Sequence, residues 1–236
     1  MTRKTLGQYF TELHHRRESD HQLHHIQSGP YLTLSRQYGC AGYELALALV
    51  KILDRQAEAD LPWMIYNRGI LKMLSGETEI RVEILEEERR SKPSMMASLL
   101  RSFSSERSMP GFEVRRHVAL LIRRIAHGGR AIIIGQGGAG ATQDLPNGLS
   151  VRLEAPEDWR IERVAIRQGI DRDSAAILVR TRDAARDYLR RLYESTHPGR
   201  SAFQLTYNSA SFSNEQIAEH IVAMLKIKGI WPEPSC

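Results

Sequence analysis

The stretch Tyr31–Leu53, YLTLSRQYGCAGYELALALVKIL, carries three signals in succession. Its first four residues, Tyr31 to Leu34, form an apolar run that predicts a short strand. Gly39 and Gly42 then permit positive φ, which lets backbone N–H groups converge on an anion. Apolar residues recur at helical spacing from Tyr43 to Leu53. A strand, a glycine loop and a helix in this order form either a phosphate-binding unit or an ordinary βα turn.

Downstream of this unit, segments typical of strands alternate with segments typical of helices. The apolar runs Ala131–Ile134 and Leu149–Leu153 predict buried strands, and Phe203–Tyr207 predicts the last strand. The expected helices are residues 64–74, Glu113–Ala126, a helix beginning at Pro156, residues 172–194 and Glu215–Lys226. Strands that alternate with helices predict an α/β protein whose mainly parallel sheet is covered on both faces.

The composition is that of an ordinary folded protein. The chain has 236 residues, of which 42% are hydrophobic and 26% charged, enough for one α/β domain with a buried core. No apolar run approaches the roughly 18–20 residues that cross a bilayer, and the first residues lack the apolar segment of a signal peptide. The two cysteines imply no disulfide framework. These features predict a cytoplasmic protein without a membrane segment.

Arginine dominates the basic side of the charge balance. The formal net charge is +5, from 33 Lys and Arg against 28 Asp and Glu. Guanidinium groups favour bidentate recognition of carboxylate or phosphate. Because the chain has no run of five or six like charges, this balance does not favour nucleic acid as a partner. The sequence leaves oligomerisation open.

Two segments differ from the α/β pattern. Residues 1–28 contain five of the nine histidines, but their spacing matches no closed zinc motif. A polar, His-rich N-terminal extension is therefore favoured over a metal site, and no metal ligands are assigned. Residues 75–110 are charged and serine-rich, which is typical of an excursion from a core. The rest of the chain, residues 29–236, is predicted to form one domain.

A second glycine stretch, GQGGAG at Gly135–Gly140, matches the dinucleotide-binding pattern GxGxxG. It follows the predicted strand Ala131–Ile134, and Glu154 lies near the position of a ribose-binding acid. A pyrophosphate-binding helix needs several turns, however, and Pro146 leaves barely one before the next strand. A strand-end turn is therefore favoured over a dinucleotide site.

The segment YLTLSRQYGCAGYELALAL resembles the loop of the cytidylate kinase-like family, a branch of the P-loop nucleoside monophosphate kinases. Members of that family typically have S-R-x-Y-G-S-G-G-x-E-I-A between a strand and a helix. The likeness continues in order through IYNRGIL, residues 130–164, TRDAARDYLRRLYE and FQLTYNSASFSNEQIAEHI, and thus covers most of residues 30–226. It implies a P-loop NTPase-type three-layer α/β/α fold, with a helical nucleotide-binding excursion at about 64–112 and arginine-rich lid helices at about 157–195.

The resemblance also implies ATP, Mg²⁺ and a nucleoside monophosphate as ligands. Its loop assigns the nucleotide cofactor to Ser35, Arg36, Gly39, Cys40, Ala41, Gly42, Tyr43 and Glu44. The acceptor is assigned to Tyr66, Asn67, Arg68 and Gln136. The catalytic set is Arg160, Arg163, Asp183 and Arg186, in which Asp183 holds an arginine or the acceptor. Helical spacing places Arg160, Arg163 and Arg167 on one face, for which a solvated arginine face is the alternative.

The chain departs from a Walker loop and from the family at several charged positions. Gly42 stands where a Walker loop has lysine, and Glu44, where it has Ser or Thr, could bind Mg²⁺ or repel phosphates. Asn67, Gln136 and Gln204 replace charged residues that the family usually carries at those positions, and Tyr43 replaces an often basic one. Loss of one preorganised electrostatic contact typically costs about 10²–10³ in rate.

Two functions follow as hypotheses. The first is a nucleoside monophosphate kinase-like phosphotransferase that moves a phosphoryl group from ATP to CMP or a related acceptor, with Arg36 or a lid arginine replacing the missing lysine. The second is a catalytically weakened or inactive nucleotide- or anion-binding regulatory protein on the same fold. The neutralised positions leave open whether the protein is an enzyme at all.

Overall fold

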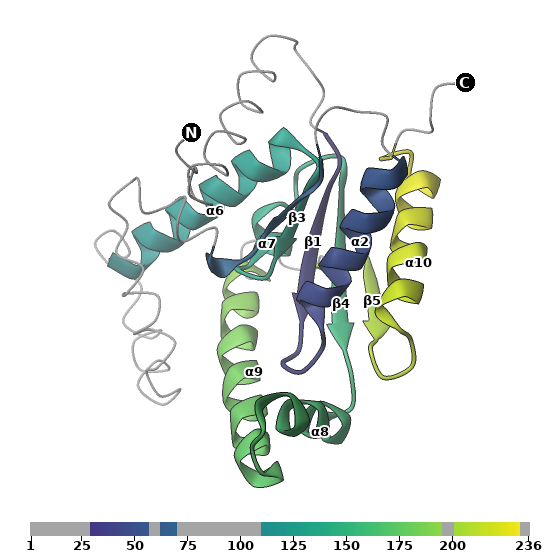
Figure 1. Ribbon diagram of the computed structural model, residues 1–236. Coiled ribbons are helices and arrows are strands. Elements are labelled where there is room, and N and C mark those ends of the chain that lie inside the picture. Colours follow the sequence, from purple (N-terminus) through teal and green to yellow (C-terminus); the bar gives the residue numbers. More distant parts are fainter. Residues whose placement is uncertain (1–28, 57–61, 70–109, 195–200, 232–236) are drawn as a thin grey trace, which may run out of the picture.

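The strands of the computed structural model form one parallel sheet in the order β2-β3-β1-β4-β5 (Figure 1). The structure describes residues 29–56, 62–69, 110–194 and 201–231. Within them the strands are β1 (Tyr31–Arg36), β2 (Met64–Tyr66), β3 (Ala131–Ile134), β4 (Gly148–Glu154) and β5 (Leu205–Asn208). The first strand is therefore central, and its connection and that of β3 leave in opposite directions. Ligands of open α/β sheets bind at such switch points, outside the carboxyl ends of the strands.

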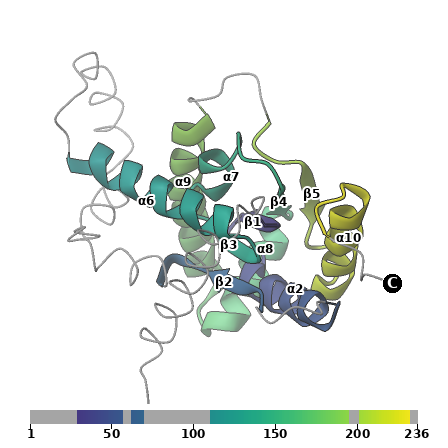
Figure 2. The same ribbon diagram turned by 90° about the horizontal axis from the view of Figure 1, so that it is seen from above.

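Helices cover both faces of this sheet and its carboxyl edge. Figure 2 shows α2 and α10 on one face and α6, α7 and α9 on the other. Below the carboxyl ends of the strands in Figure 1, α8 packs against α9, and α9 also contacts α7. The helices are α2 (Gly42–Gln56), α6 (Pro110–Gly128), α7 (Gly138–Ala141), α8 (Glu157–Gln168), α9 (Arg172–Glu194) and α10 (Asn214–Ile227). None of these described helices is both long and apolar enough to span a bilayer.

Alternation along the strands divides the core between the two faces. Leu32 and Leu34 of β1 pack with α2 and α10, whereas Ile133 of β3 packs with α6. In β4, Leu149, Val151 and Leu153 join the first cluster, so Ser150, Arg152 and Glu154 point to the opposite face. A parallel sheet covered on both faces is normally apolar on both. The polar residues of β4 therefore show that this part of the sheet face is not packed as apolar core.

The predicted α/β class and mainly parallel sheet are confirmed, but one predicted helix is wrong. Met64–Tyr66, expected to begin a helix over residues 64–74, is the strand β2, which pairs in parallel with β3. Hydrophobic periodicity over three residues cannot distinguish a buried strand from a buried helix. The pairing with β3 makes this segment a strand. The last strand lies at Leu205–Asn208, one or two residues later than predicted.

The predicted subdivisions are only partly covered by the described residues. The extension 1–28 and residues 70–109 of the excursion lie outside them. The helices predicted within 157–195 are α8 and α9. Their role as a lid stays a prediction.

The buried Tyr31 should make the stability of the protein fall as the pH rises through the alkaline range. Its buried hydroxyl donates to the carbonyl oxygens of Thr142 (3.1 Å) and Leu145 (3.3 Å), and burial raises the pKa of the phenol above its ordinary value near 10. Tyr31 therefore ionises at a lower pH in the unfolded chain than in the folded protein. The stability that it contributes is complete below about pH 10 and is lost as the pH rises toward the pKa of Tyr31 in the folded protein. We expect Tyr31→Phe to reduce this alkaline loss in urea unfolding at pH 8 and pH 11. An equal loss in the variant would contradict the assignment to Tyr31.

Candidate anion-binding site

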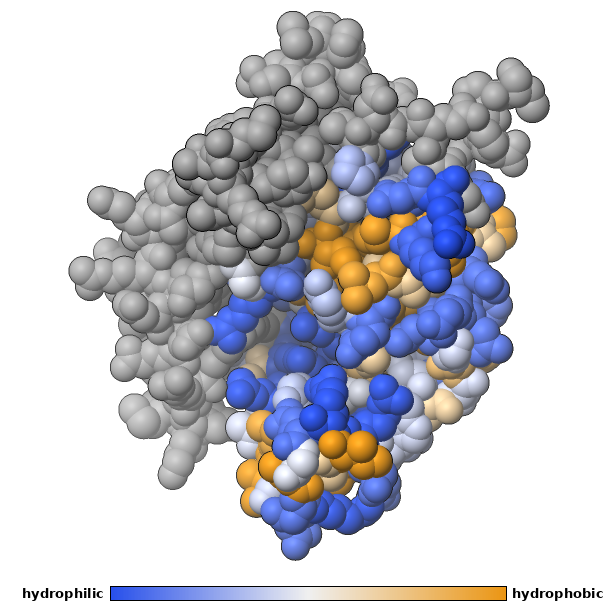
Figure 3. Space-filling view, viewed as in Figure 1, coloured by the Kyte–Doolittle hydropathy of each residue, from blue (hydrophilic) through white to orange (hydrophobic). Residues whose placement is uncertain are grey.

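A cavity of about 1170 Å³ lies against β1, the turn after β3 and one face of α9. Hydrophilic residues gather on the described surface between α2 and the helices α8 and α9 (Figure 3). The charged residues that line the cavity are Arg36, Arg68, Arg182, Arg186 and Arg190. No aspartate or glutamate is among its described lining residues. Five arginines without a lining carboxylate make this cavity a candidate site for a multiply charged anion.

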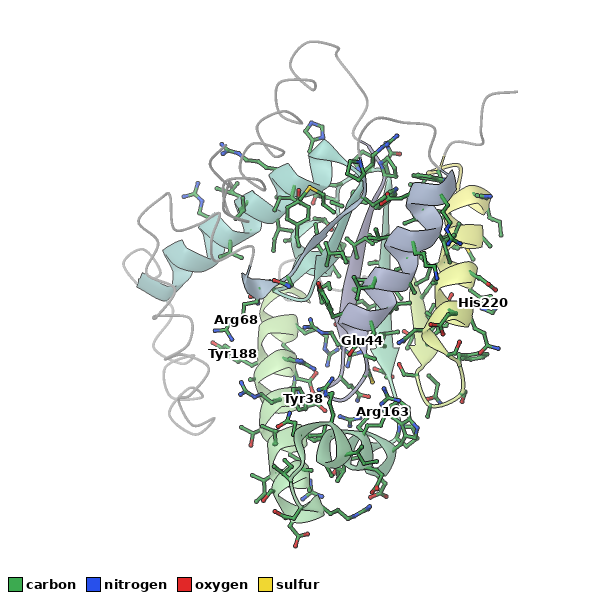
Figure 4. All side chains as sticks on the ribbon, in the orientation of Figure 1. Tyr38, Glu44, Arg68, Arg163, Tyr188 and His220 are labelled. Atoms are coloured by element: carbon green, nitrogen blue, oxygen red, sulfur yellow. The ribbon has the colours of Figure 1, made fainter. Side chains whose placement is uncertain are left out.

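One face of α9 supplies three of these arginines. Arg182, Arg186 and Arg190 are spaced four residues apart, so they lie one above another on the same side of the helix. Arg68 approaches from the segment that follows β2 and lies beside α9 in Figure 4. The arginines thus come from segments far apart in the sequence and meet only in the fold.

The Arg36 side chain lies against both of the glycine stretches that the sequence offered as phosphate-binding loops. A Cβ on Gly42, at the start of α2, would come within 3.2 Å of Arg36 Cδ. A Cβ on Gly135, where φ is +72°, would lie 2.3 Å from Arg36 Nη1. Glycine at both positions therefore makes room for the guanidinium. The Arg36 side chain therefore lies between the two loops.

The turn after β3 is the strand-end turn that the sequence favoured. The helix that follows it, α7, has only four residues, so GQGGAG has no long helix on which to bind a pyrophosphate. Gln136 lines the cavity with a left-handed φ of 56°. The dinucleotide-binding interpretation therefore fails on geometry.

Arg160 and Asp183 fix the first loop to the carboxyl-edge helices. Arg160 forms an ion pair with Asp183 and donates to the carbonyl oxygens of Ala155 (2.9 Å) and Tyr38 (3.1 Å). Asp183 also accepts a 2.6 Å hydrogen bond from the Tyr38 amide. Gly39, at φ +94°, lies so close to Arg160 that a Cβ there would be 2.9 Å from the arginine Cβ. The loop, α8 and α9 thus share one hydrogen-bonded cluster.

Arg186 lies between this cluster and the cavity. Its guanidinium stacks on the Tyr38 ring at 5.1 Å and donates to the Arg36 carbonyl oxygen at 3.3 Å. Burial lowers the pKa of Arg186 from its ordinary value, while the nearby Asp183 carboxylate opposes that shift. Arginine nevertheless stays protonated in proteins. An anion bound in the cavity would stabilise this guanidinium, because its charge would replace the hydration that burial removes.

The polar face of β4 adds a group that sequence reasoning missed. Arg152 donates to Glu154 (2.5 Å) and to the Ser35 hydroxyl (3.3 Å), and its guanidinium lies 5.3 Å from the centre of the Phe203 ring. Both Ser35 and Phe203 line the cavity. The signal was the alternation in LSVRLE, in which every second residue of a supposedly buried strand is polar.

The structure brings only some of the predicted cofactor-binding residues to the cavity. Ser35 and Arg36 line it, whereas Gly39–Glu44 do not. Cys40 is buried, and burial raises the pKa of its thiol. Glu44 lies 3.9 Å from Arg167 of α8 (Figure 4).

The other predicted site residues are spread over several environments. Arg68, Gln136 and Arg186 line the cavity, whereas Tyr66 is buried in β2 and Asn67 follows it without lining the cavity. Arg160 and Asp183 belong to the cluster under the loop. Arg163 is exposed on α8 and stacks on Trp159 at 4.7 Å, so Arg160 and Arg163 do not share one environment. The residues that line the cavity without having been predicted include Ser174, Thr181 and Phe203.

A central parallel strand, a glycine loop that opens a helix and arginines at the carboxyl edge are the features of a P-loop kinase-like fold. The match of a family model makes the assignment specific. The chain belongs to the cytidylate kinase-like family, whose model matches residues 31–210.

One solved structure shares this fold at low sequence identity, and a second shows a weaker likeness. An uncharacterized protein from Eubacterium ventriosum superposes with a TM-score of 0.60 at 15% identity, over 84% of this chain and 98% of that one. A shikimate kinase from Bacteroides thetaiotaomicron gives a TM-score of 0.47 at 14% identity, over the same shares of the two chains. Comparison with curated protein sequences finds no significant match.

Proposed function

We propose that the protein is a nucleotide-dependent phosphotransferase that moves a phosphoryl group from ATP to CMP or a related nucleoside monophosphate. The observation that carries this proposal is the Arg36 side chain, which lies against both glycine turns in a cavity lined by four more arginines. Transfer of a phosphoryl group depends on positioning and on charge neutralisation more than on covalent chemistry by the protein. Membership of the cytidylate kinase-like family supports the same reaction.

The roles of the residues follow from their positions. The amino end of α2, a helix of 15 residues, offers backbone N–H groups to the phosphates of ATP, and Arg36 supplies the cation that a Walker lysine would supply. Arg186 neutralises the group in transfer from the α9 side, and Arg68 and Gln136 contact the acceptor. Arg160 and Asp183 act as positioning residues, because their side chains bond to the loop at Tyr38 and do not line the cavity.

The cavity does not fit a magnesium ion held by the protein. Mg²⁺ in kinase-type sites usually takes one or two carboxylates together with the substrate phosphates. The described lining residues provide no carboxylate, and Glu44 lies beside Arg167 instead. Elsewhere in the described chain, His, Cys, Asp and Glu form no group of three suited to a metal. No step of this proposal therefore passes through a metal.

A second candidate is a regulatory protein that binds a nucleotide or another phosphate-bearing anion without transferring a group. The observation that favours it is the same lack of a lining carboxylate, combined with a first loop in which Gly39–Glu44 do not line the cavity. Such a cavity binds an anion, but it offers neither a general base nor a metal ligand to assist transfer.

A turnover and binding panel separates the two candidates. Purified protein is given ATP with CMP, UMP, AMP or GMP, with Mg²⁺ or with EDTA, and ADP formation is measured beside the melting temperature. We expect ADP formation with at least one acceptor, and a raised melting temperature with nucleotides because ligands that bind only the folded state stabilise it.

The outcomes differ clearly. Nucleotides that raise the melting temperature without ADP formation would reject the transferase and leave the regulatory protein. If neither quantity changes, both candidates fail. Arg180→Met is a suitable control variant, because Arg180 lies on α9 with a side chain that is 70% exposed and does not line the cavity.

A further inference from the structure

Arg152 of β4 lies behind the wall of the cavity rather than in it. Its side chain is 11% exposed and is not among the described lining residues. It contacts two residues that do line the cavity, since its Nη1 donates to the Ser35 hydroxyl at 3.3 Å and its guanidinium lies 5.3 Å from the centre of the Phe203 ring. A buried side chain that bonds to the wall of a site determines how that wall presents its polar groups.

Contacts on several sides fix the Arg152 guanidinium. Its Nε donates to Glu154 at 2.5 Å, and its Nη2 lies 4.0 Å from the Asp187 carboxylate of α9. Asp187 also accepts a hydrogen bond at 3.2 Å from Arg190, which lines the cavity. Because Ser35 and Arg152 are paired in register on β1 and β4, the sheet sets the distance between them. The guanidinium is therefore held in one orientation with respect to Ser35.

The chemistry of these two side chains fixes the direction of their hydrogen bond. A guanidinium has five N–H donors and no acceptor, so the Ser35 oxygen must accept. The proton of the hydroxyl then points elsewhere, and within the described part of the chain it has no acceptor. Ser35 is half-buried and lines the cavity. An anion in the cavity is therefore a suitable acceptor for that proton.

We propose that Arg152 is a positioning residue for phosphate binding, because its bond to the Ser35 oxygen commits the hydroxyl proton to the anion in the cavity. Ser35 thereby adds a neutral donor next to the Arg36 cation. This role of Arg152 rests on the proposed function in one respect, namely that a phosphate-bearing ligand occupies the cavity.

The test is a double-mutant cycle on Arg152 and Ser35. Isothermal titration calorimetry on the full chain measures the binding of ATP, CMP and pyrophosphate in EDTA, and the variants are compared with the probe that the wild type binds most tightly. Ser35→Ala removes the hydroxyl and should weaken binding about tenfold, as for the loss of a hydrogen bond to a charged group. Arg152→Gln offers the hydroxyl a carbonyl oxygen as a competing acceptor, so it should also weaken binding about tenfold. The double variant should bind at most about twofold more weakly than Ser35→Ala, because the two residues act through one hydroxyl.

Two further variants separate positioning from a general structural role. Arg152→Lys keeps donors and has no acceptor, so its affinity should stay within about threefold of the wild type. Arg123 also pairs with a carboxylate at 2.5 Å, that of Asp144, and does not line the cavity, so Arg123→Gln should leave the affinity unchanged. Melting temperatures recorded without ligand show that each variant is folded at the temperature of the titration.

The role of Arg152 and the proposed function fail differently. If the wild type binds none of the three probes, both fail. If the wild type binds a probe and Arg152→Gln leaves the affinity unchanged, the role of Arg152 alone is rejected. That role is also rejected if Arg152→Gln weakens binding by the same factor with and without the Ser35 hydroxyl. Binding without ADP formation rejects the transferase, and the same cycle still decides the role of Arg152.

Discussion

Replacing Arg36 by methionine is expected to lower ADP formation about 10²–10³-fold while the protein stays folded. The guanidinium lies against Gly42 and Gly135, and we assign to it the charge that a Walker lysine would carry. Loss of one preorganised cation in such a site typically costs about 2.7–4 kcal/mol of transition-state stabilisation. Steady-state kinetics on the preferred acceptor measures the loss, and circular dichroism checks the fold.

Two comparisons make the Arg36 result specific. Arg36→Lys keeps the charge but not the planar fork, so an intermediate rate is expected. Arg180→Met removes an exposed arginine from α9 and should leave the rate unchanged. A rate for Arg36→Met within a factor of three of the wild type would reject the role assigned to Arg36. In a protein that binds without transfer, the same variant should lose anion affinity instead.

The second large effect is expected on stability and comes from Arg160. Arg160→Met removes one member of a buried ion pair whose side chains are 5% and 18% exposed, and it leaves the Asp183 carboxylate without its arginine. Breaking a buried pair in this way typically costs about 3–5 kcal/mol. For a protein of this size the melting temperature should fall by about 10 °C. Differential scanning calorimetry, with urea unfolding as a second measure, tests this.

The fold provides a matched control for Arg160. Glu157 and Arg180 also join α8 to α9, at 2.8 Å, but in solvent, with side chains that are 46% and 70% exposed. An exposed pair contributes at most about 1 kcal/mol, so Arg180→Met should barely change the melting temperature. The double variant Arg160→Met with Asp183→Leu should recover part of the loss, because no lone carboxylate remains. Equal effects of Arg160→Met and Arg180→Met would contradict the structural role of Arg160.

The parallel sheet could be predicted from the sequence because its longer elements carry strong local signals. Ala131–Ile134 is uniformly apolar, and residues 172–194 keep helical spacing over more than six turns. Met64–Tyr66 could not be recognised as a strand, because only its pairing with β3 makes it one. The shortness of α7 was predictable, since Pro146 and Asn147 leave no room for a longer helix.

The sequence predicted that arginines form the candidate site, but it did not predict which of them line the cavity and which hold the loop. Helical spacing groups Arg160 with Arg163, yet one is buried under the loop and the other is exposed over Trp159. That difference arises from how α8 packs on α9, which no local pattern encodes. The contact of Arg36 with both glycine turns also depends on the pairing of β1 with β3. The sequence therefore identified several of the arginines but could not show which of them line the cavity.

The bonds between the first loop and α9 have a mechanical consequence. Asp183 holds the Tyr38 amide and Arg186 holds the Arg36 carbonyl oxygen, so the loop and the helix that carries the cavity arginines are fastened at two points one helical turn apart. A tilt of α9 would pull the loop with it, and a shift of the loop would drag the arginines. We therefore expect an anion that displaces one of these two elements to displace the other with it.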